Sequence, residues 1–164
     1  MSCNINIWQV ISNDKTLSIL TKLIKKVGLE DFVASLKNST FFTPTDVAFA
    51  GNASLTDYLF DPTTPESTVK NVIYYFITGK PYTTAQLVPA VNLVMLDGRI
   101  LVSLRSLYYP FMPILTDQVN NNANITDANL STADNNYIQK VNNILQYGYI
   151  PYPIIINPYT QQPI

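Results

Sequence analysis

Residues 40–50 of the chain read TFFTPTDVAFA, and they carry its most specific local pattern. The first four residues, Thr40–Thr43, are all aromatic or β-branched and predict a brief buried strand. Pro44 stops that strand because it has no backbone N–H to donate. Thr45 or Asp46 can then cap a turn of helix at residues 47–50, which Gly51 is placed to end. Strand, proline, cap and helix all fall within the range 40–51.

Helical periodicity is found on both sides of this stretch. Apolar residues recur every three or four positions from Thr16 to Val27, which predicts an amphipathic helix that Gly28 ends. The same spacing predicts shorter helices over Leu29–Leu36 and Ser54–Phe60. Thr64-Pro65-Glu66 predicts the start of a helix that runs to Phe76, with threonine as N-cap and proline as first helical residue.

The second half of the chain is dominated by strand patterns. Asp97-Gly98 lies between the apolar runs 93–96 and 99–104, which predicts a β-hairpin with a two-residue type I′ turn. Shorter strand-like pieces follow at 114–119 and 125–130, separated by Asn-rich turns. A last strand is predicted over Tyr137–Val141, after the turn at Asn135-Asn136.

Length and composition exclude several classes of protein. The 164 residues fit one domain, and 47% apolar against 13% charged residues exclude a disordered chain. With a net charge of −1 and one small lysine cluster, nucleic acid is not an expected partner. Apolar runs are too short for a membrane-spanning helix, so we expect no membrane insertion.

Residue types also argue against catalysis. The sequence contains no histidine, which excludes Ser-His-Asp and Cys-His sites and histidine metal sites, and Cys3 alone cannot hold a metal. No phosphate-binding glycine loop is present. The acidic residues Asp46, Asp57, Asp61 and Asp97 each have a local capping or turn role. We therefore expect a non-enzymatic protein without metal or cofactor.

Three stretches resemble the fasciclin domain family, over about residues 13–145. Residues 40–50 look like the family's first signature, and VIYYFITG at 72–79 looks like the segment that usually carries Tyr-His. Residues 129–145 look like the closing signature. This chain has Phe76 where the second segment has its histidine. In the closing signature it has Asn136 for glycine, Gln139 for histidine and Asn142 for aspartate.

The resemblance implies an α+β fold, a wedge in which two small β-sheets pack together and helices cover an edge. We therefore expect an N-terminal lead-in at 1–12, the fasciclin-like domain at 13–146 and a Pro/Tyr/Ile-rich tail at 147–164. It also implies a role in adhesion or protein contact, of the kind known for periostin-type matrix proteins. Because the departures from the family pattern fall on polar positions, they weaken the expectation that this chain shares the family's binding activity. They do not weaken the expectation for the fold.

The first candidate contact site comes from that resemblance. Tyr75 and Phe76 match the Tyr-His segment linked with integrin contact, although Phe76 also fits as the last core residue of its helix. Phenylalanine cannot make the hydrogen bonds of histidine. Asn129-Leu130 falls near the Asp-Ile pair credited with receptor contact but lacks its charge. Both departures argue against integrin binding.

Two further candidate sites come from composition. Tyr108, Tyr109, Phe111 and Met112 lie beside prolines, as interface anchors do, although they fit equally well as a cover over a sheet edge. The tail from Tyr147 is apolar and uncharged, and its segment Ile154, Ile155, Ile156 can add a strand to an exposed edge, in the same chain or in a neighbour.

The sequence therefore predicts a non-enzymatic module for protein contact or adhesion, whose partner is another protein or a second copy of itself. The alternative is a structural subunit of a virus particle or an intracellular assembly, locked through the tail. The first residues lack the features of a secretory signal, so we expect synthesis in the cytosol and incorporation in an assembly, or export by another route.

Overall fold

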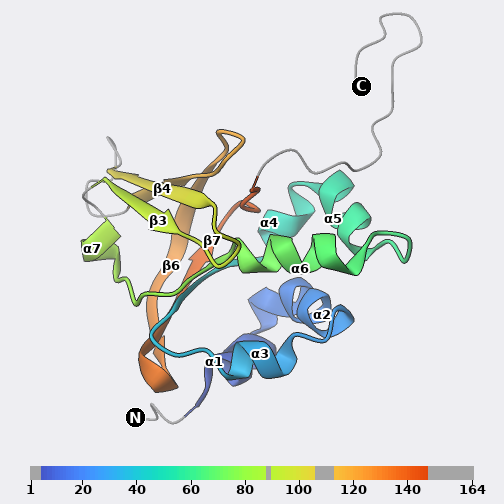
Figure 1. Cartoon of the computed structure of the whole chain (residues 1–164), viewed down its shortest axis with the longest axis horizontal. Helices are drawn as coiled ribbons and strands as arrows, with labels where there is room; N and C mark the ends of the chain where they lie inside the picture. The colour runs from blue at the N-terminus through green and yellow to red at the C-terminus, as the bar shows by residue number, and fades with distance from the viewer. Residues whose placement is uncertain (1–4, 88–89, 106–112, 148–164) are drawn as a thin grey trace, which may run out of the picture.

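The computed structural model describes residues 5–87, 90–105 and 113–147, which Figure 1 draws as a coloured ribbon. Helices dominate the first half of the chain, and strands dominate the second half. In chain order the elements are α1 (Ile7–Asn13), η1 (Lys15–Leu17), α2 (Ser18–Lys26), α3 (Glu30–Ala34), β1 (Thr40–Pro44), α4 (Asp46–Ala50), α5 (Ala53–Phe60), α6 (Glu66–Tyr74), β2 (Ile77–Thr78), α7 (Thr84–Leu87), β3 (Val91–Val94), β4 (Ile100–Arg105), β5 (Pro113–Thr116), β6 (Asn122–Thr132), η2 (Ala133–Asn135) and β7 (Asn136–Val141).

The strands form one seven-stranded sheet in the order β2-β1-β7-β6-β5-β4-β3. Neighbours run antiparallel except β1 and β7, which are parallel. The 11-residue strand β6 belongs to both halves of the sheet, and two register shifts bend it between Ile125 and Leu130. A single bridge from Thr78 to Met95 joins the two edges. The α+β class is thus confirmed, with the two expected small sheets continuous through β6.

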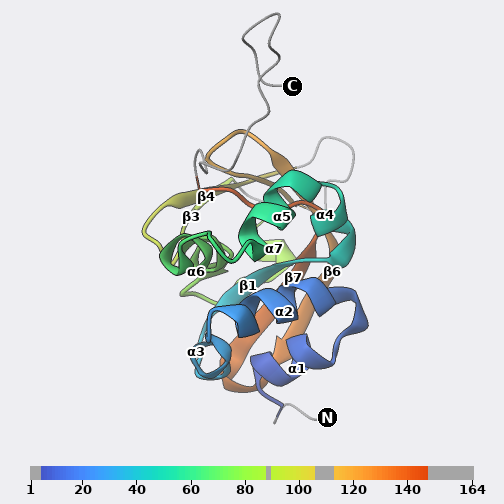
Figure 2. The ribbon, with the colours of Figure 1, turned by 90° about the vertical axis from the view of Figure 1, so that its right-hand side faces the viewer.

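Helices cover one side of the half made by β1, β7 and β6. Figure 2 shows α1, α2 and α3 in front of these strands. All five residues of β1 are buried, including the adjacent Phe41 and Phe42, whose side chains point to opposite sides of the strand. Both sides of β1 are therefore packed, as the apolar stretch at its centre predicted.

Asp46 has a role that the local pattern did not predict. Thr45 is the N-cap residue of α4, but its side chain makes no capping hydrogen bond. The carboxylate of Asp46 instead accepts hydrogen bonds from the Ser18 hydroxyl at 2.6 Å and from the Ile19 N–H at 2.8 Å. It caps the start of α2, whose own N-cap residue supplies no side-chain bond. Residues 40–50 thereby fix an N-terminal helix against the sheet.

Several local predictions hold and a few need correction. Gly28 ends α2 with a φ of 68°, as predicted. The N-cap residue of α6 is Pro65 rather than Thr64. The hairpin forms, but only Gly98 has a positive φ, and its N–H donates to the Met95 carbonyl at 2.8 Å. The turn is therefore a three-residue loop of type I with a glycine bulge, since a type I′ turn needs two residues with positive φ.

Two helices escaped the sequence analysis. α1 starts at a capping box in which Asn6 and Gln9 bond each other's backbone N–H groups, and its Ile7 and Ile11 are fully buried. The lead-in at 1–12 therefore contributes to the core. α7 is one turn long, too short for periodicity to reveal. Among the described residues, no helix has the length and apolar character needed to cross a membrane.

Candidate functional site

The solvent side of β3, β4 and β5 carries an apolar surface. Side chains alternate along these strands, so that Leu93, Leu101 and Leu115 are fully buried on the inner side. Their neighbours point outward. We call the outward apolar side chains the outer face; they are Val94, Ile100, Val102, Leu104 and Ile114.

Strand register makes the outer face continuous. Val94 lies opposite Ile100, and Leu104 lies opposite Ile114. Val102 lies between them on β4. Val94 is 60% exposed and Leu104 42% exposed, whereas the other three are half-buried. In Figures 1 and 2 these strands lie at the far end of the molecule from α1, α2 and α3. No described helix covers the outer face.

Polar residues border the outer face. Thr116 and Asn122 form a cross-strand pair with a 2.9 Å hydrogen bond, and Asn124 lies beside Ile114. An apolar centre with an uncharged polar rim is the composition of a protein-contact surface. Sequence analysis missed it because the runs 93–96 and 99–104 are almost continuously apolar, which favours burial on both sides.

The outer face ends at an open edge of β3. The N–H of Met95 donates to Arg99 across the hairpin, so the backbone groups of Asn92 and Val94 point the other way. The Thr78 hydroxyl donates to the Val94 carbonyl at 2.8 Å. The Val94 N–H and both backbone groups of Asn92 have no hydrogen-bond partner within the described part of the chain.

A hollow of about 180 Å³ lies along this edge. On its other side the chain is held away from β3, because Thr40 bonds the backbone of both Lys80 and Tyr82 at 2.7 Å. The hollow is lined by Thr78, Gly79, Lys80, Tyr82, Asn92 and Val94. The two edges of the sheet are therefore joined at the Thr78–Met95 bridge and lie apart beyond it, along Val94 and Asn92.

Tyr75 and Phe76, the first predicted contact site, belong to the core. Both side chains are fully buried, and the Tyr75 hydroxyl donates to the Ile100 carbonyl at 2.7 Å. Burial raises the pKa of the Tyr75 phenol, which keeps it protonated and able to donate. This burial fits the alternative reading of Phe76 as a core residue, and the contact role of the pair stays a prediction.

The other two predicted sites lie outside the described residues. They are Tyr108, Tyr109, Phe111 and Met112, and the tail segment Ile154, Ile155 and Ile156. The first of them falls in the connection from β4 to β5. The last paired residues before and after that connection are Arg105 and Pro113.

The structure brings together two of the replaced polar positions, Gln139 and Asn129. Gln139 is fully buried; its carbonyl accepts from the Asn129 N–H at 2.8 Å, and its amide donates to the Asn129 side chain at 2.9 Å. The same amide donates to the Tyr82 carbonyl, and Asn129 exchanges two hydrogen bonds with Thr84. These residues tie the bend of β6 to the segment before α7, which is a structural role.

Asn136 also has a structural role. It is 1% exposed, and its side-chain carbonyl accepts from the Ser39 N–H at 2.9 Å. Its amide donates to the carbonyls of Leu36 at 2.7 Å and Ala133 at 3.1 Å. Asn142, which follows β7, accepts from the Asn124 N–H at 2.9 Å. Through these hydrogen bonds Asn136 and Asn142 join β7 to the residues before β1 and to β6.

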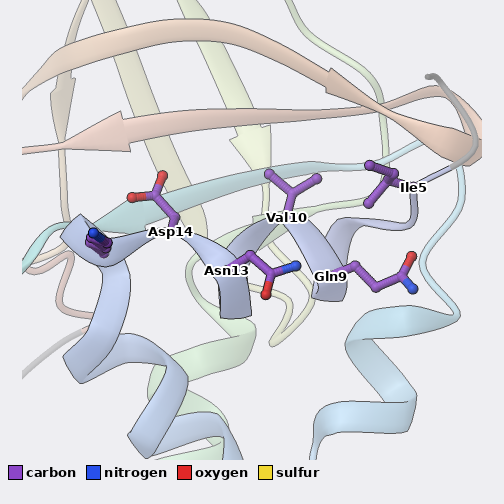
Figure 3. A pocket seen from close by; sticks show the side chains of 6 residues that line it. Ile5, Gln9, Val10, Asn13 and Asp14 are labelled. Carbon is purple, nitrogen blue, oxygen red and sulfur yellow. The ribbon is translucent and has the colours of Figure 1, made fainter. Parts of the chain in front are cut away.

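Figure 3 shows a second, more open hollow of about 530 Å³ beside α1. Gln9 is engaged in the capping box of α1, and Asp14 forms an ion pair with Lys140 at 2.5 Å and a hydrogen bond with Thr16. Burial raises the pKa of Asp14, but the bonds from Lys140 and Thr16 outweigh it and hold the pKa below its usual range. The ion pair of Asp14 with Lys140 joins the start of η1 to β7, which is a structural role.

The described residues contain no group of three metal-ligating side chains. The sequence model of the Fasciclin domain matches residues 15–147. The chain belongs to the fasciclin domain family. Comparison with the curated proteins gives no match.

A solved structure supports the same fold. The FAS1 domain pair of the insect cell adhesion molecule fasciclin I matches with a TM-score of 0.72 and 16% sequence identity. The match covers 87% of this chain and 51% of the other, so this chain spans about half of that domain pair.

Proposed function

We propose that this fasciclin domain is a non-enzymatic module for protein contact of the adhesion type, and that it acts through the outer face of β3, β4 and β5. The observation that carries the proposal is the exposure of adjacent large apolar side chains, above all Val94 and Leu104. Burying apolar surface contributes about 25 cal/mol per Å², so covering this face favours association.

The fold family supports the adhesion role, since the matching insect protein is a cell adhesion molecule. The chemistry of the chain supports a non-enzymatic role. The sequence has no histidine, and two of its acidic side chains, Asp14 and Asp46, are engaged in an ion pair and a helix cap. No observation favours the alternative of a subunit of a virus particle, and we do not propose it.

The test is an adhesion assay with a matched control. Beads coated with the full chain are scored for clustering with one another and for attachment to cultured cells. The test variant is Val94→Asp with Leu104→Asp. The control is Val47→Asp with Ile5→Asp, at side chains that are 76% and 45% exposed but lie outside the outer face.

We expect the test variant to lower adhesion at least tenfold, the effect of about 1.4 kcal/mol, because a carboxylate loses its hydration in the contact. The control variant should stay within about twofold of the unchanged chain. Circular dichroism checks that both remain folded. The proposal fails if the unchanged chain neither clusters beads nor holds cells, or if both variants lose adhesion equally.

A further inference from the structure

The described chain ends beside the hairpin of β3 and β4. The ring of Tyr147 lies under the Arg99 guanidinium, 4.5 Å from its centre, and makes an edge contact with Tyr75. Arg99 immediately follows the turn whose glycine is Gly98. Residues 148–164 therefore start at the hairpin end of β3, and the open part of the edge begins just beyond the Thr78–Met95 bridge.

The open edge needs a partner that supplies backbone hydrogen bonds. Asn92 offers an N–H and a carbonyl, and Val94 offers an N–H, all pointing into the 180 Å³ hollow. Such an edge is a template for another strand. Among the side chains around it, Val94 and the ring of Tyr82 can pack against an apolar strand, whereas Thr78, Lys80 and Asn92 are polar.

The segment after Tyr147 contains one stretch suited to that task. Prolines at 151, 153, 158 and 163 interrupt its backbone N–H groups. Between Pro153 and Pro158 lie three consecutive isoleucines, Ile154–Ile156, which are β-branched and favour a strand. No other part of residues 148–164 combines free N–H groups with three β-branched residues in a row.

We propose that Ile154–Ile156 adds a strand to the open edge of β3 in the same molecule. β3 runs toward the hairpin turn, and the segment starts at that turn, so a segment that runs back along the edge is antiparallel to β3. The seven residues from Tyr147 to Ile154 span up to about 23 Å, and β3 is only about 13 Å long. A segment tethered this closely has an effective concentration in the millimolar range.

The added strand has two effects. It removes an unpaired edge, which otherwise invites uncontrolled pairing between molecules. Its alternate isoleucines face the same side as Val94 and enlarge the outer face by one strand. The inference thus deepens the proposed function by adding the tail to the contact surface, and it rests on that function only for this second effect.

The test is site-resolved amide hydrogen exchange by NMR on the full chain, without any partner. In the unchanged protein the amides of Asn92 and Val94 should exchange at least tenfold more slowly than in Ile156→Pro, which removes the N–H that the added strand turns toward Asn92. The control, Thr160→Pro, places a proline elsewhere in the same segment and should keep the protection.

Each remaining outcome overturns the proposal. Equal exchange in all three proteins means that Ile154–Ile156 does not cover the edge. Protection that rises with protein concentration, together with a dimer in light scattering, assigns the strand to a second copy instead. Since no adhesion partner enters this experiment, its failure and that of the bead assay are separate results.

Discussion

Thr40 and Thr43 give the sharpest test of the structure. Both lie on β1 and both are fully buried, yet their hydroxyl groups have different surroundings. The Thr40 hydroxyl donates to the Lys80 carbonyl and accepts from the Tyr82 N–H, each at 2.7 Å. The Thr43 hydroxyl has no hydrogen-bond partner among the described residues. Changing either threonine to valine keeps volume and strand preference nearly constant.

The two substitutions should change stability in opposite directions. Thr40→Val removes two hydrogen bonds from the partly buried Lys80 carbonyl and Tyr82 N–H, at about 0.5–1.5 kcal/mol each, and we expect a net loss of about 2 kcal/mol. Thr43→Val removes an unsatisfied buried hydroxyl, and we expect a gain of about 1 kcal/mol. For a domain of this size the melting temperature should fall by about 4–8 °C in the first variant and rise by about 2–4 °C in the second.

Urea unfolding followed by fluorescence measures both free energies, and calorimetry measures the melting temperatures. Each variant serves as the control for the other, because strand, burial and substitution are the same. The reasoning is refuted if the two variants shift the free energy of unfolding in the same direction by similar amounts. That result would mean that the segment at 80–82 is not held by Thr40.

Two further predictions concern polar contacts that fasten the chain. Asn136→Ala removes three hydrogen bonds of a buried side chain and should lower the free energy of unfolding by about 3 kcal/mol. The control Asn71→Ala, on the exposed side of α6, should be neutral or slightly stabilising. Urea unfolding of both variants measures the difference. Asp14, whose pKa is lowered, contributes stability that is complete above about pH 4 and is lost as the pH falls through its folded-state pKa. The difference in unfolding free energy between the unchanged chain and Asp14→Asn should therefore shrink from pH 7 to pH 3, and an unchanged difference would contradict the Lys140 pair.

Local patterns were sufficient wherever a cap, a glycine or a periodic run lies within a few residues. They located α2, β1, α6 and the hairpin around Gly98 to within a few positions. They failed for α7, which is a single turn, and for α1, whose capping box at Asn6 and Gln9 was a readable but overlooked signal. The type of turn at the hairpin was also wrong, because a loop one residue longer suits the same glycine.

The candidate site depended more on contacts between distant residues. Asn136 bonds Leu36 and Ser39 from about a hundred positions away, so the sequence could not show that its side chain joins these two segments. Likewise Tyr75 and Phe76 were predicted as a contact site from their place in a motif, and packing put both in the core.

The sequence by itself determined the fasciclin fold. Residues 40–50, with their strand, proline and aspartate, and the apolar positions around them specify local structures that fit together in this fold. Only the tertiary structure decided that Asp46 caps α2, because a helix terminus can be capped from any part of the chain that reaches it. The tertiary structure likewise decided which face of the β3–β4 hairpin is exposed to solvent. Both sides of β3 and β4 are apolar in the sequence, and the arrangement of the other elements covers Leu93 and Leu101 while leaving Val94 and Leu104 in contact with water.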